Sequence, residues 1–132
     1  MATFSTLEEA QACFVNDRFA TGNGCVLEEV GEDYAVASVE IRDGHRNGLG
    51  GVMGGLIFTL ADFASAVVIN QQHYPTVGLD GDFKFLSSTR GEKLFARAEL
   101  VKTGKTTSVC RAMVTDNLGK DIALFIGTGF KL

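Results

Sequence analysis

The sequence contains no tryptophan, one proline, two histidines and three cysteines among its 132 residues. The cysteines, Cys13, Cys25 and Cys110, are odd in number and far apart, and two of them lie in apolar segments. This spacing indicates reduced thiols rather than a disulfide framework. The two histidines, His45 and His73, are also far apart, and no Cys-x-x-Cys is present. We therefore expect no metal site and no cofactor.

Strong positive charge and long uncharged apolar runs are missing as well. The formal net charge is −4, which argues against nucleic acid and anionic membranes as partners. No segment approaches the roughly 20 uncharged apolar residues needed to cross a bilayer, and the start "MATFSTLEEA" lacks a basic flank followed by an apolar stretch. With 45% apolar and 21% charged residues, the chain is predicted to form one domain, residues 1–132, in the cytoplasm.

Hydrophobic periodicity predicts two helices and two groups of strands. Residues 6–19 begin with a capping box, Thr6 and Glu9, which predicts a short amphipathic helix. From residue 25 to 41 apolar and polar residues alternate around the break "GED", which predicts two antiparallel strands. Residues 54–70 are apolar on nearly every side, as in a buried helix. Four further strand-like segments follow, at residues 76–86, 93–102, 106–115 and 120–130.

The order of these elements is helix, two strands, helix, four strands. Long strands joined by short turns form an antiparallel sheet, and the apolar helix must be covered by it. We therefore predict an α+β fold in which an antiparallel sheet of about six strands wraps around one central helix.

Two glycine-rich segments look like nucleotide-binding motifs but lack their essential residues. "GLGGVM" has Met53 at the third glycine of G-x-G-x-x-G, and no alternation of strands and helices follows it. "TGKTT" has Glu99 at the first glycine of a P-loop and no helix pattern behind it, so it is better explained as a hairpin turn. No G-x-S-x-G is present, which removes support for a serine hydrolase of the α/β type.

The segment "HRNGLGGVMGGLIFTLAD", residues 45–62, places a run of glycines directly before the central helix. A helix start carries free backbone N–H groups and the positive end of the helix dipole, so it can hold a partial negative charge such as a polarised carbonyl oxygen. Gly54 and Gly55 would let a ligand approach this backbone closely. The alternative is that they only permit close packing of the helix against a sheet.

The same segment ends in a single carboxylate, Asp62, among apolar neighbours. Such an acid is either satisfied by hydrogen bonds, with Thr59 or Ser65 nearby, or lines a functional cleft. Gly54 and Asp62 are eight residues apart, which is about 12 Å along a helix. One small reacting group cannot contact both, so a site that uses both needs a second copy of the helix across a twofold axis. The sequence thus predicts a site built by two subunits.

These residues resemble the signature of the PaaI-type hotdog-fold acyl-CoA thioesterases, within the 4-hydroxybenzoyl-CoA thioesterase-like superfamily. That signature is roughly H-x-N-x-x-G-x-x-H-G-G, followed by an apolar helix with an acid eight residues after the first glycine of the pair. The matching residues are His45, Asn47, Gly50, Gly54, Gly55 and Asp62. The resemblance continues through the strand series after residue 77 and covers nearly the whole chain.

The resemblance implies a hotdog fold and a thioesterase that cleaves acyl-CoA. It implies a homodimer with a continuous sheet, and often a dimer of dimers, that is, a homotetramer. It also implies that the backbone N–H of Gly54, helped by the Asn47 side chain, holds the thioester carbonyl. Asp62 of the other subunit would act as general base on water or as nucleophile.

Two positions depart from the family pattern. Met53 replaces the histidine before the glycine pair, and Gly78 replaces a hydroxyl-bearing residue often found near the acid. Either change could lower the rate or alter the substrate. We expect both positions, together with His45 and Gly55, to contact substrate.

The phosphates of CoA would need basic partners. The turns that join the later strands carry four basic residues, Arg90, Lys93, Lys102 and Lys105. For any one of them alone, an ordinary solvated surface residue is the better explanation. We take Arg90 and Lys105 as the candidates for substrate binding.

Two other functions stay open at this level. Met53 and Gly78 could mark a non-catalytic protein that binds or senses acyl-CoA. A hotdog hydratase usually needs a histidine beside the acid, and neither His45 nor His73 is well placed for that role. The sequence does not define the acyl group.

Overall fold

The computed structural model describes residues 2–132. It contains three α-helices, one short 3-10 helix and six strands. In chain order these are α1 (Leu7–Phe14), α2 (Arg18–Gly22), β1 (Val26–Val30), β2 (Tyr34–Glu40), η1 (Asp43–His45), α3 (Gly54–Gln72), β3 (Thr76–Phe85), β4 (Lys93–Thr103), β5 (Thr107–Asp116) and β6 (Asp121–Lys131).

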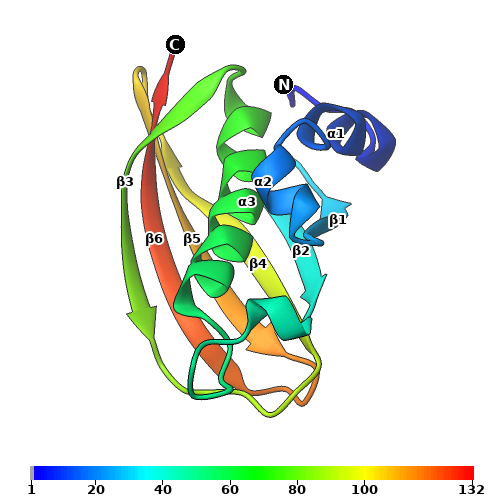
Figure 1. Ribbon diagram of the computed structural model, residues 1–132. Helices are drawn as coiled ribbons and strands as arrows, with labels where there is room; N and C mark the ends of the chain where they lie inside the picture. The colour runs from blue at the N-terminus through cyan, green and yellow to red at the C-terminus, as the bar shows by residue number, and fades with distance from the viewer. Residues whose placement is uncertain (1) are drawn as a thin grey trace.

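The six strands form one antiparallel sheet in the order β1-β2-β4-β5-β6-β3. The sheet curves around α3, while α1 and α2 lie beside the helix near β1 (Figure 1). This arrangement confirms the predicted α+β hotdog architecture, including the number of strands. It leaves β1 and β3 as the two edges of the sheet.

Small side chains on three central strands let α3 approach the sheet closely. Ala35 and Ala37 of β2 pair with Ala98 and Ala96 of β4, and Ala98 in turn pairs with Ala112 of β5. All five side chains are fully buried. The alternation that predicted β2 therefore has a direct structural reason, since every second residue faces the helix.

The central helix α3 ends at Gln72 rather than at Asn70 as the sequence predicted. The side chain of Asn70 donates to the Ala66 carbonyl and accepts from the Thr76 N–H, so it joins the helix to β3 instead of ending the helix. By length and apolar composition α3 would suffice to cross a membrane, but 67% of its 18-residue apolar window is buried inside the fold. It is the core helix of the domain.

The predicted helix over residues 6–19 is in fact two helices. The Thr6 hydroxyl accepts from Glu9 N–H, as the capping box predicted, but the Glu9 carboxylate accepts from Ser5 N–H. The first helix then stops after Phe14, where the Asn16 side chain donates to the backbone carbonyl of Cys13. Local bonds of this kind compete with the helix ladder, which explains why the chain turns here.

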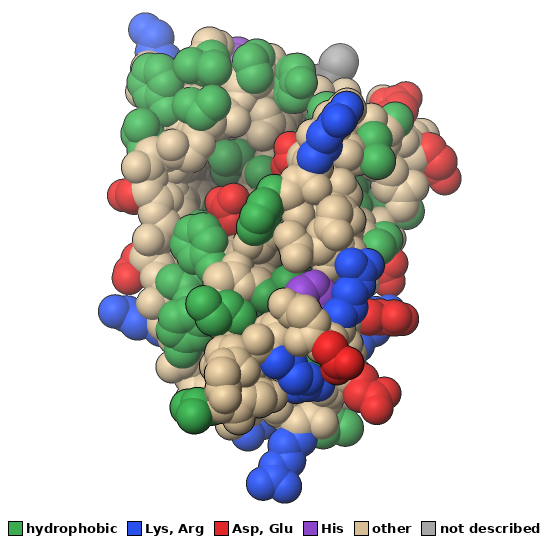
Figure 2. All heavy atoms as spheres, viewed as in Figure 1, with side chains coloured by type: hydrophobic (Ala, Val, Ile, Leu, Met, Phe, Trp, Pro, Cys, Tyr) green, Lys and Arg blue, Asp and Glu red, His purple; other side chains and the backbone are tan. Residues whose placement is uncertain are grey.

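Strand β3 is the exposed edge of the sheet on the side of α3 that α1 and α2 leave open. All but two of its residues are exposed, including the apolar side chains of Val77, Leu79 and Phe85. Figure 2 shows hydrophobic side chains gathered along this edge and a hollow between β3 and α3. The exposed residues of α3 are Gly55, Phe58 and Asp62, and of these Asp62 lines a pocket between α3 and β3.

Candidate active site

The start of α3 is open to a ligand. Its N-cap residue, Met53, makes no side-chain capping bond, and its first turn contains no acidic residue. The N–H groups of Gly54 and Gly55 have no hydrogen-bond partner among residues 2–132, whereas Leu56 N–H bonds to the Met53 carbonyl. Two free donors therefore point out of the positive end of the helix.

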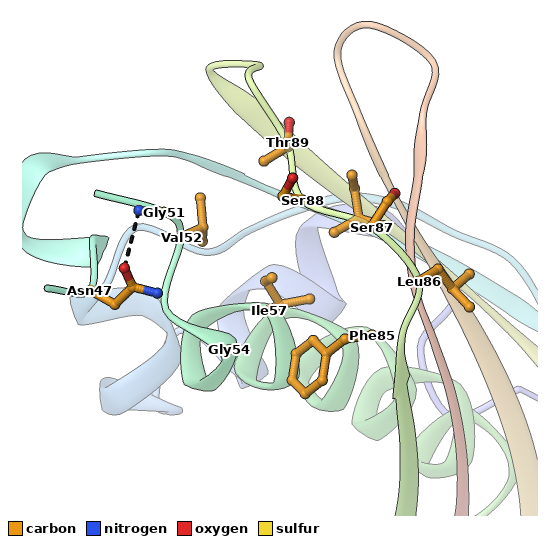
Figure 3. Close-up of a pocket in the computed structure, with 11 residues that line it drawn as sticks. Asn47, Gly51, Val52, Gly54, Ile57, Phe85, Leu86, Ser87, Ser88 and Thr89 are labelled. Atoms are coloured by element: carbon orange, nitrogen blue, oxygen red, sulfur yellow. Dashed lines mark hydrogen bonds between the residues drawn. The ribbon is translucent and has the colours of Figure 1, made fainter. Parts of the chain in front are cut away.

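Asn47 adds a third donor beside this helix start. Its Oδ1 accepts from the N–H groups of Leu49 and Gly51, at 3.0 and 3.1 Å. These two bonds fix which end of the amide is oxygen, so Nδ2 is left as a donor with no partner among the described residues. Figure 3 shows Nδ2 on the side of Asn47 that faces the turn into Gly54.

Two residues that carry these donors, Gly54 and Asn47, share one pocket, which we call the entrance pocket, with a volume of about 480 Å³. The side chains of Ile57 and Phe85 contribute to its apolar wall, and the loop between β3 and β4 runs along its other side (Figure 3). A Cβ atom at Gly54 would lie 2.8 Å from Phe85 Cζ, so glycine is what lets this ring reach the helix start. The pocket is lined by Asn47, Gly51, Val52, Gly54, Ile57, Phe85, Leu86, Ser87, Ser88, Thr89 and Ile122.

His45, Met53 and Gly55 lie on the other side of the helix start. They line a second pocket of about 350 Å³ with Phe19 and Thr59 among their neighbours. His45 is buried, and its Nδ1 accepts from the Arg42 N–H at 2.9 Å, which leaves Nε2 as the ring nitrogen that carries hydrogen. The structure thus divides the predicted substrate residues at the helix start between two neighbouring pockets.

Asp62 lies two turns further along α3 and lines two hollows. One is a groove of about 300 Å³ shared with Asp17 and Arg18. The other, which we call the glycine crevice, has about 110 Å³ and lies between α3 and the strands β3, β5 and β6. The crevice is lined by Asp62, Ser65, Ala66, Ile69, Thr76, Gly78, Asp80, Cys110, Phe125, Gly127 and Thr128.

The carboxylate of Asp62 has no hydrogen bond to any described residue. The two hydroxyls weighed as its partners do not reach it, because Thr59 donates to the Gly55 carbonyl and the Ser65 hydroxyl bonds to nothing. One side of Asp62 is open to solvent, and the protein around the other side raises the pKa of its carboxyl by desolvation. The nearby carboxylate of Asp17 raises that pKa further. Asp62 is thus a free acid at the wall of a hollow.

Within one protomer, Gly54 and Asp62 do not form a single site. Both lie on α3, eight residues apart, which is about 12 Å along the helix. Gly54 lines the entrance pocket, whereas Asp62 lines the groove and the glycine crevice. Gly78 lies on the crevice with Asp62, where a Cβ atom would meet nothing within 4 Å.

The basic residues expected near a CoA phosphate lie at opposite ends of the sheet. Arg90 follows Thr89 of the entrance pocket, whereas Lys105 lies in the turn after the 11-residue strand β4. Sequence reasoning did not find Phe85 or the serines at 87 and 88, because nothing in their pattern places the β3–β4 loop against the helix start. This contact becomes visible only from the position of β3 at the edge of the sheet.

A model of the thioesterase superfamily matches residues 49–123. The acyl-coenzyme A thioesterase PaaI of Escherichia coli is 29% identical over 126 residues, which cover 95% of this chain and 90% of PaaI. A putative esterase of Archaeoglobus fulgidus is 30% identical over 120 residues, which cover 90% of this chain and 78% of that protein.

Solved structures with the same fold include proteins similar to this chain in sequence. The structure of E. coli PaaI, a protein from the phenylacetic acid degradation operon, superposes with a TM-score of 0.89 at 28% identity and covers 95% of this chain and 91% of its own. The smu.793 protein of Streptococcus mutans UA159, solved with bound acetyl CoA, has a TM-score of 0.77 at 27% identity and covers 81% and 87% of the two chains.

Proposed function

The chain belongs to the thioesterase superfamily, and from that premise we propose that it is an acyl-CoA thioesterase that works as a homodimer. One observation supports this function above the others. Gly54, with its free N–H, and Asn47, with its free Nδ2, line the same pocket at the helix start, and the free N–H of Gly55 is the next donor along the helix. Such a group of donors stabilises the negative charge that develops on a thioester carbonyl oxygen during attack.

Asp62 supplies the second half of the chemistry. In the general-base route Asp62 takes a proton from water, and the resulting hydroxide adds to the thioester carbon. The oxyanion of the tetrahedral intermediate accepts hydrogen bonds from Gly54 N–H and Asn47 Nδ2. Collapse of this intermediate expels the CoA thiolate and leaves the free acid. Because thiolate is a good leaving group, the site needs no strong general acid.

A nucleophilic route uses the same residues. The Asp62 carboxylate adds to the thioester carbon, CoA thiolate leaves, and water hydrolyses the mixed anhydride. Only the nucleophilic route can transfer an Asp62 oxygen to the product acid and place solvent oxygen in Asp62. A single turnover in H₂¹⁸O puts the label in the acid for the base route, and in Asp62 or the acid for the nucleophilic route, depending on which anhydride carbon water attacks.

The distance between Gly54 and Asp62 requires a second protomer. We propose that Gly54 and Asn47 of one protomer face Asp62 of its partner across a twofold axis. The exposed edge of β3 supports such an assembly, because an antiparallel partner strand would satisfy its open backbone groups and cover Val77 and Leu79. A dimer of dimers remains an expectation from the family resemblance.

The names of the relatives point to CoA as the leaving group. PaaI is named an acyl-coenzyme A thioesterase, and smu.793 was solved with acetyl CoA. Here Arg90, beside the entrance pocket, is our candidate for a phosphate contact from the same protomer, whereas Lys105 would contribute only from the partner. The buried free thiols Cys25 and Cys110 accord with a reducing compartment, and we place the protein in the cytoplasm.

The test is thiol release from a panel of acyl-CoAs. We expect turnover by the native protein and a loss of about 10²- to 10⁴-fold in kcat for Asp62→Asn. The matched control is Asp33→Asn, which neutralises an exposed aspartate in the β1–β2 turn and should keep native activity. Tight acyl-CoA binding without turnover by the native protein would contradict the proposed activity. It would favour the alternative of a protein that binds or senses acyl-CoA, which the substitutions at Met53 and Gly78 suggest.

A further inference from the structure

Ser65 carries a buried hydroxyl that the fold does not use. The side chain lies on α3 one turn after Asp62 and is only 3% exposed. Its Oγ is the one buried side-chain oxygen or nitrogen without a hydrogen-bond partner that the described residues contain. Leaving such a group unpaired costs stability, so its presence calls for a reason beyond packing.

Other polar side chains on the same helix show what Ser65 does not do. Thr59 donates to the carbonyl four residues back, Gly55, at 2.7 Å. Asn70 donates in the same way to Ala66, at 2.8 Å. This backward bond is the usual solution for a hydroxyl within a helix. Ser65 makes no such bond and instead lines the glycine crevice together with Asp62.

The glycine crevice has room and partners for water. Its volume of about 110 Å³ exceeds the space that one water needs. Asp62 and Ser65 both line it, and Gly78 of β3, which lines it too, has open space where a side chain would lie. A water there would have the polar partners that an ordered site requires.

The neighbouring thiol of Cys110 does not replace such a water. Burial raises the pKa of this thiol, and the Ser65 hydroxyl beside it lowers that pKa only in part. The sulfur therefore stays a neutral thiol, which is a weak acceptor. The approach of Oγ to Sγ does not amount to a hydrogen bond that satisfies the serine.

From these contacts we propose that Ser65 positions the attacking water for Asp62, an inference that rests on the proposed thioesterase function. The water donates one hydrogen to the Asp62 carboxylate and the other to Ser65 Oγ, which leaves a lone pair of its oxygen free to attack the thioester carbon. Asp62 takes up the first proton as the carbon–oxygen bond forms, and Ser65 keeps its own. Ser65 thus supplies from α3 the hydroxyl that Gly78 cannot supply from β3.

The test is Ser65→Ala. We expect kcat to fall by about 10- to 100-fold with KM unchanged, because a poorly oriented water slows attack without weakening substrate binding. We also expect Tm to stay the same or rise, since the substitution removes an unsatisfied group. The matched control is Ser108→Ala, which removes an equally buried hydroxyl that bonds to Thr103 Oγ1 at 2.9 Å. It should lower Tm and leave kcat native.

A rescue variant separates positioning from packing. Ser65→Ala combined with Gly78→Ser returns a hydroxyl to the crevice, where Gly78 has open space, and should recover a large part of the lost kcat. Native kcat in Ser65→Ala, or a loss that Gly78→Ser does not reverse, overturns the role of Ser65. If Asp62→Asn is inactive in the same assay, the proposed function survives that result; if Asp62→Asn retains native turnover, the proposed function itself fails.

Discussion

At the scale of single residues, Asp62 joins two properties that a structural acid would not combine. It has no hydrogen bond to a described residue, and burial and the Asp17 carboxylate hold its pKa above the ordinary value. A raised pKa makes a carboxylate a stronger base at neutral pH while it remains ionised. The charged or titratable groups that face it in the two hollows are Asp17, Arg18, Asp80 and Cys110.

The like charge of Asp17 gives a pH prediction. Loss of kcat/KM on the acid side should follow protonation of Asp62, and therefore lie at higher pH than an ordinary aspartate would give. Asp17→Asn removes one cause of the raised pKa, so the acid limb of the profile should move to lower pH. Asp17 makes no side-chain capping bond for α2, so the fold should tolerate this change. An acid limb that stays in place would contradict this role for Asp17.

Asn47 has a structural and a chemical function that one substitution can separate. Asn47→Asp keeps an acceptor for the Leu49 and Gly51 N–H groups but removes the Nδ2 donor. We expect Tm to stay near native while kcat/KM falls by about 10²- to 10³-fold, the usual cost of one lost oxyanion donor. Asn47→Ala should lower both. Native activity in Asn47→Asp would show that Nδ2 does not contact the substrate.

At the scale of elements, Asp116 ties the end of β5 to a wall of the entrance pocket. Its Oδ2 accepts from the Thr89 hydroxyl at 2.5 Å, and its Oδ1 accepts from the N–H groups of Leu118 and Lys120 at 2.9 Å each. The Thr89 bond and the Lys120 N–H hold the pKa of this carboxyl below its ordinary value. One side chain thus braces both the β5–β6 turn and the loop that carries Thr89.

The pH dependence of stability tests this brace. The folded state binds the Asp116 proton more weakly than the unfolded state does, so its contribution is present above the ordinary aspartate pKa and is lost as pH falls through the lowered value. Asp116→Ala should lower Tm at neutral pH and raise KM through the loosened pocket wall. The difference in Tm from native protein should shrink in acid, and a difference that is constant with pH would refute this assignment.

The sequence predicted elements with a regular period and missed features that depend on tertiary contacts. The alternation in β2 and the apolar helix α3 were predicted, since half-buried strands and core helices leave clear patterns. The break after Phe14 was not, because the amphipathic pattern continues while Asn16 bonds to the backbone. The glycines before α3 and Asp62 were identified as candidates from the sequence. The position of Phe85 at the helix start and the crevice beside Ser65 were not, because both depend on the pairing of β3 with β6.

At the scale of the whole molecule, a single protomer holds two halves of a site that it cannot bring together. The donors at the start of α3 and the acid of the same helix lie in different hollows. The exposed edge strand β3 lies beside α3, on the side away from α1 and α2 (Figure 1). We propose that antiparallel association along this edge closes two equivalent sites, each with donors from one protomer and an acid from the other.

Mixed dimers test this claim most directly. Asn47→Ala and Asp62→Asn protomers, each inactive as homodimers, should regain activity when unfolded and refolded together in equal amounts. A heterodimer then holds one site with native Asn47 and native Asp62 and one doubly mutated site. Random pairing should therefore restore about a quarter of the native site concentration. If the mixture stays as inactive as its parents while heterodimers form, donors and acid act within one protomer, and the account is wrong.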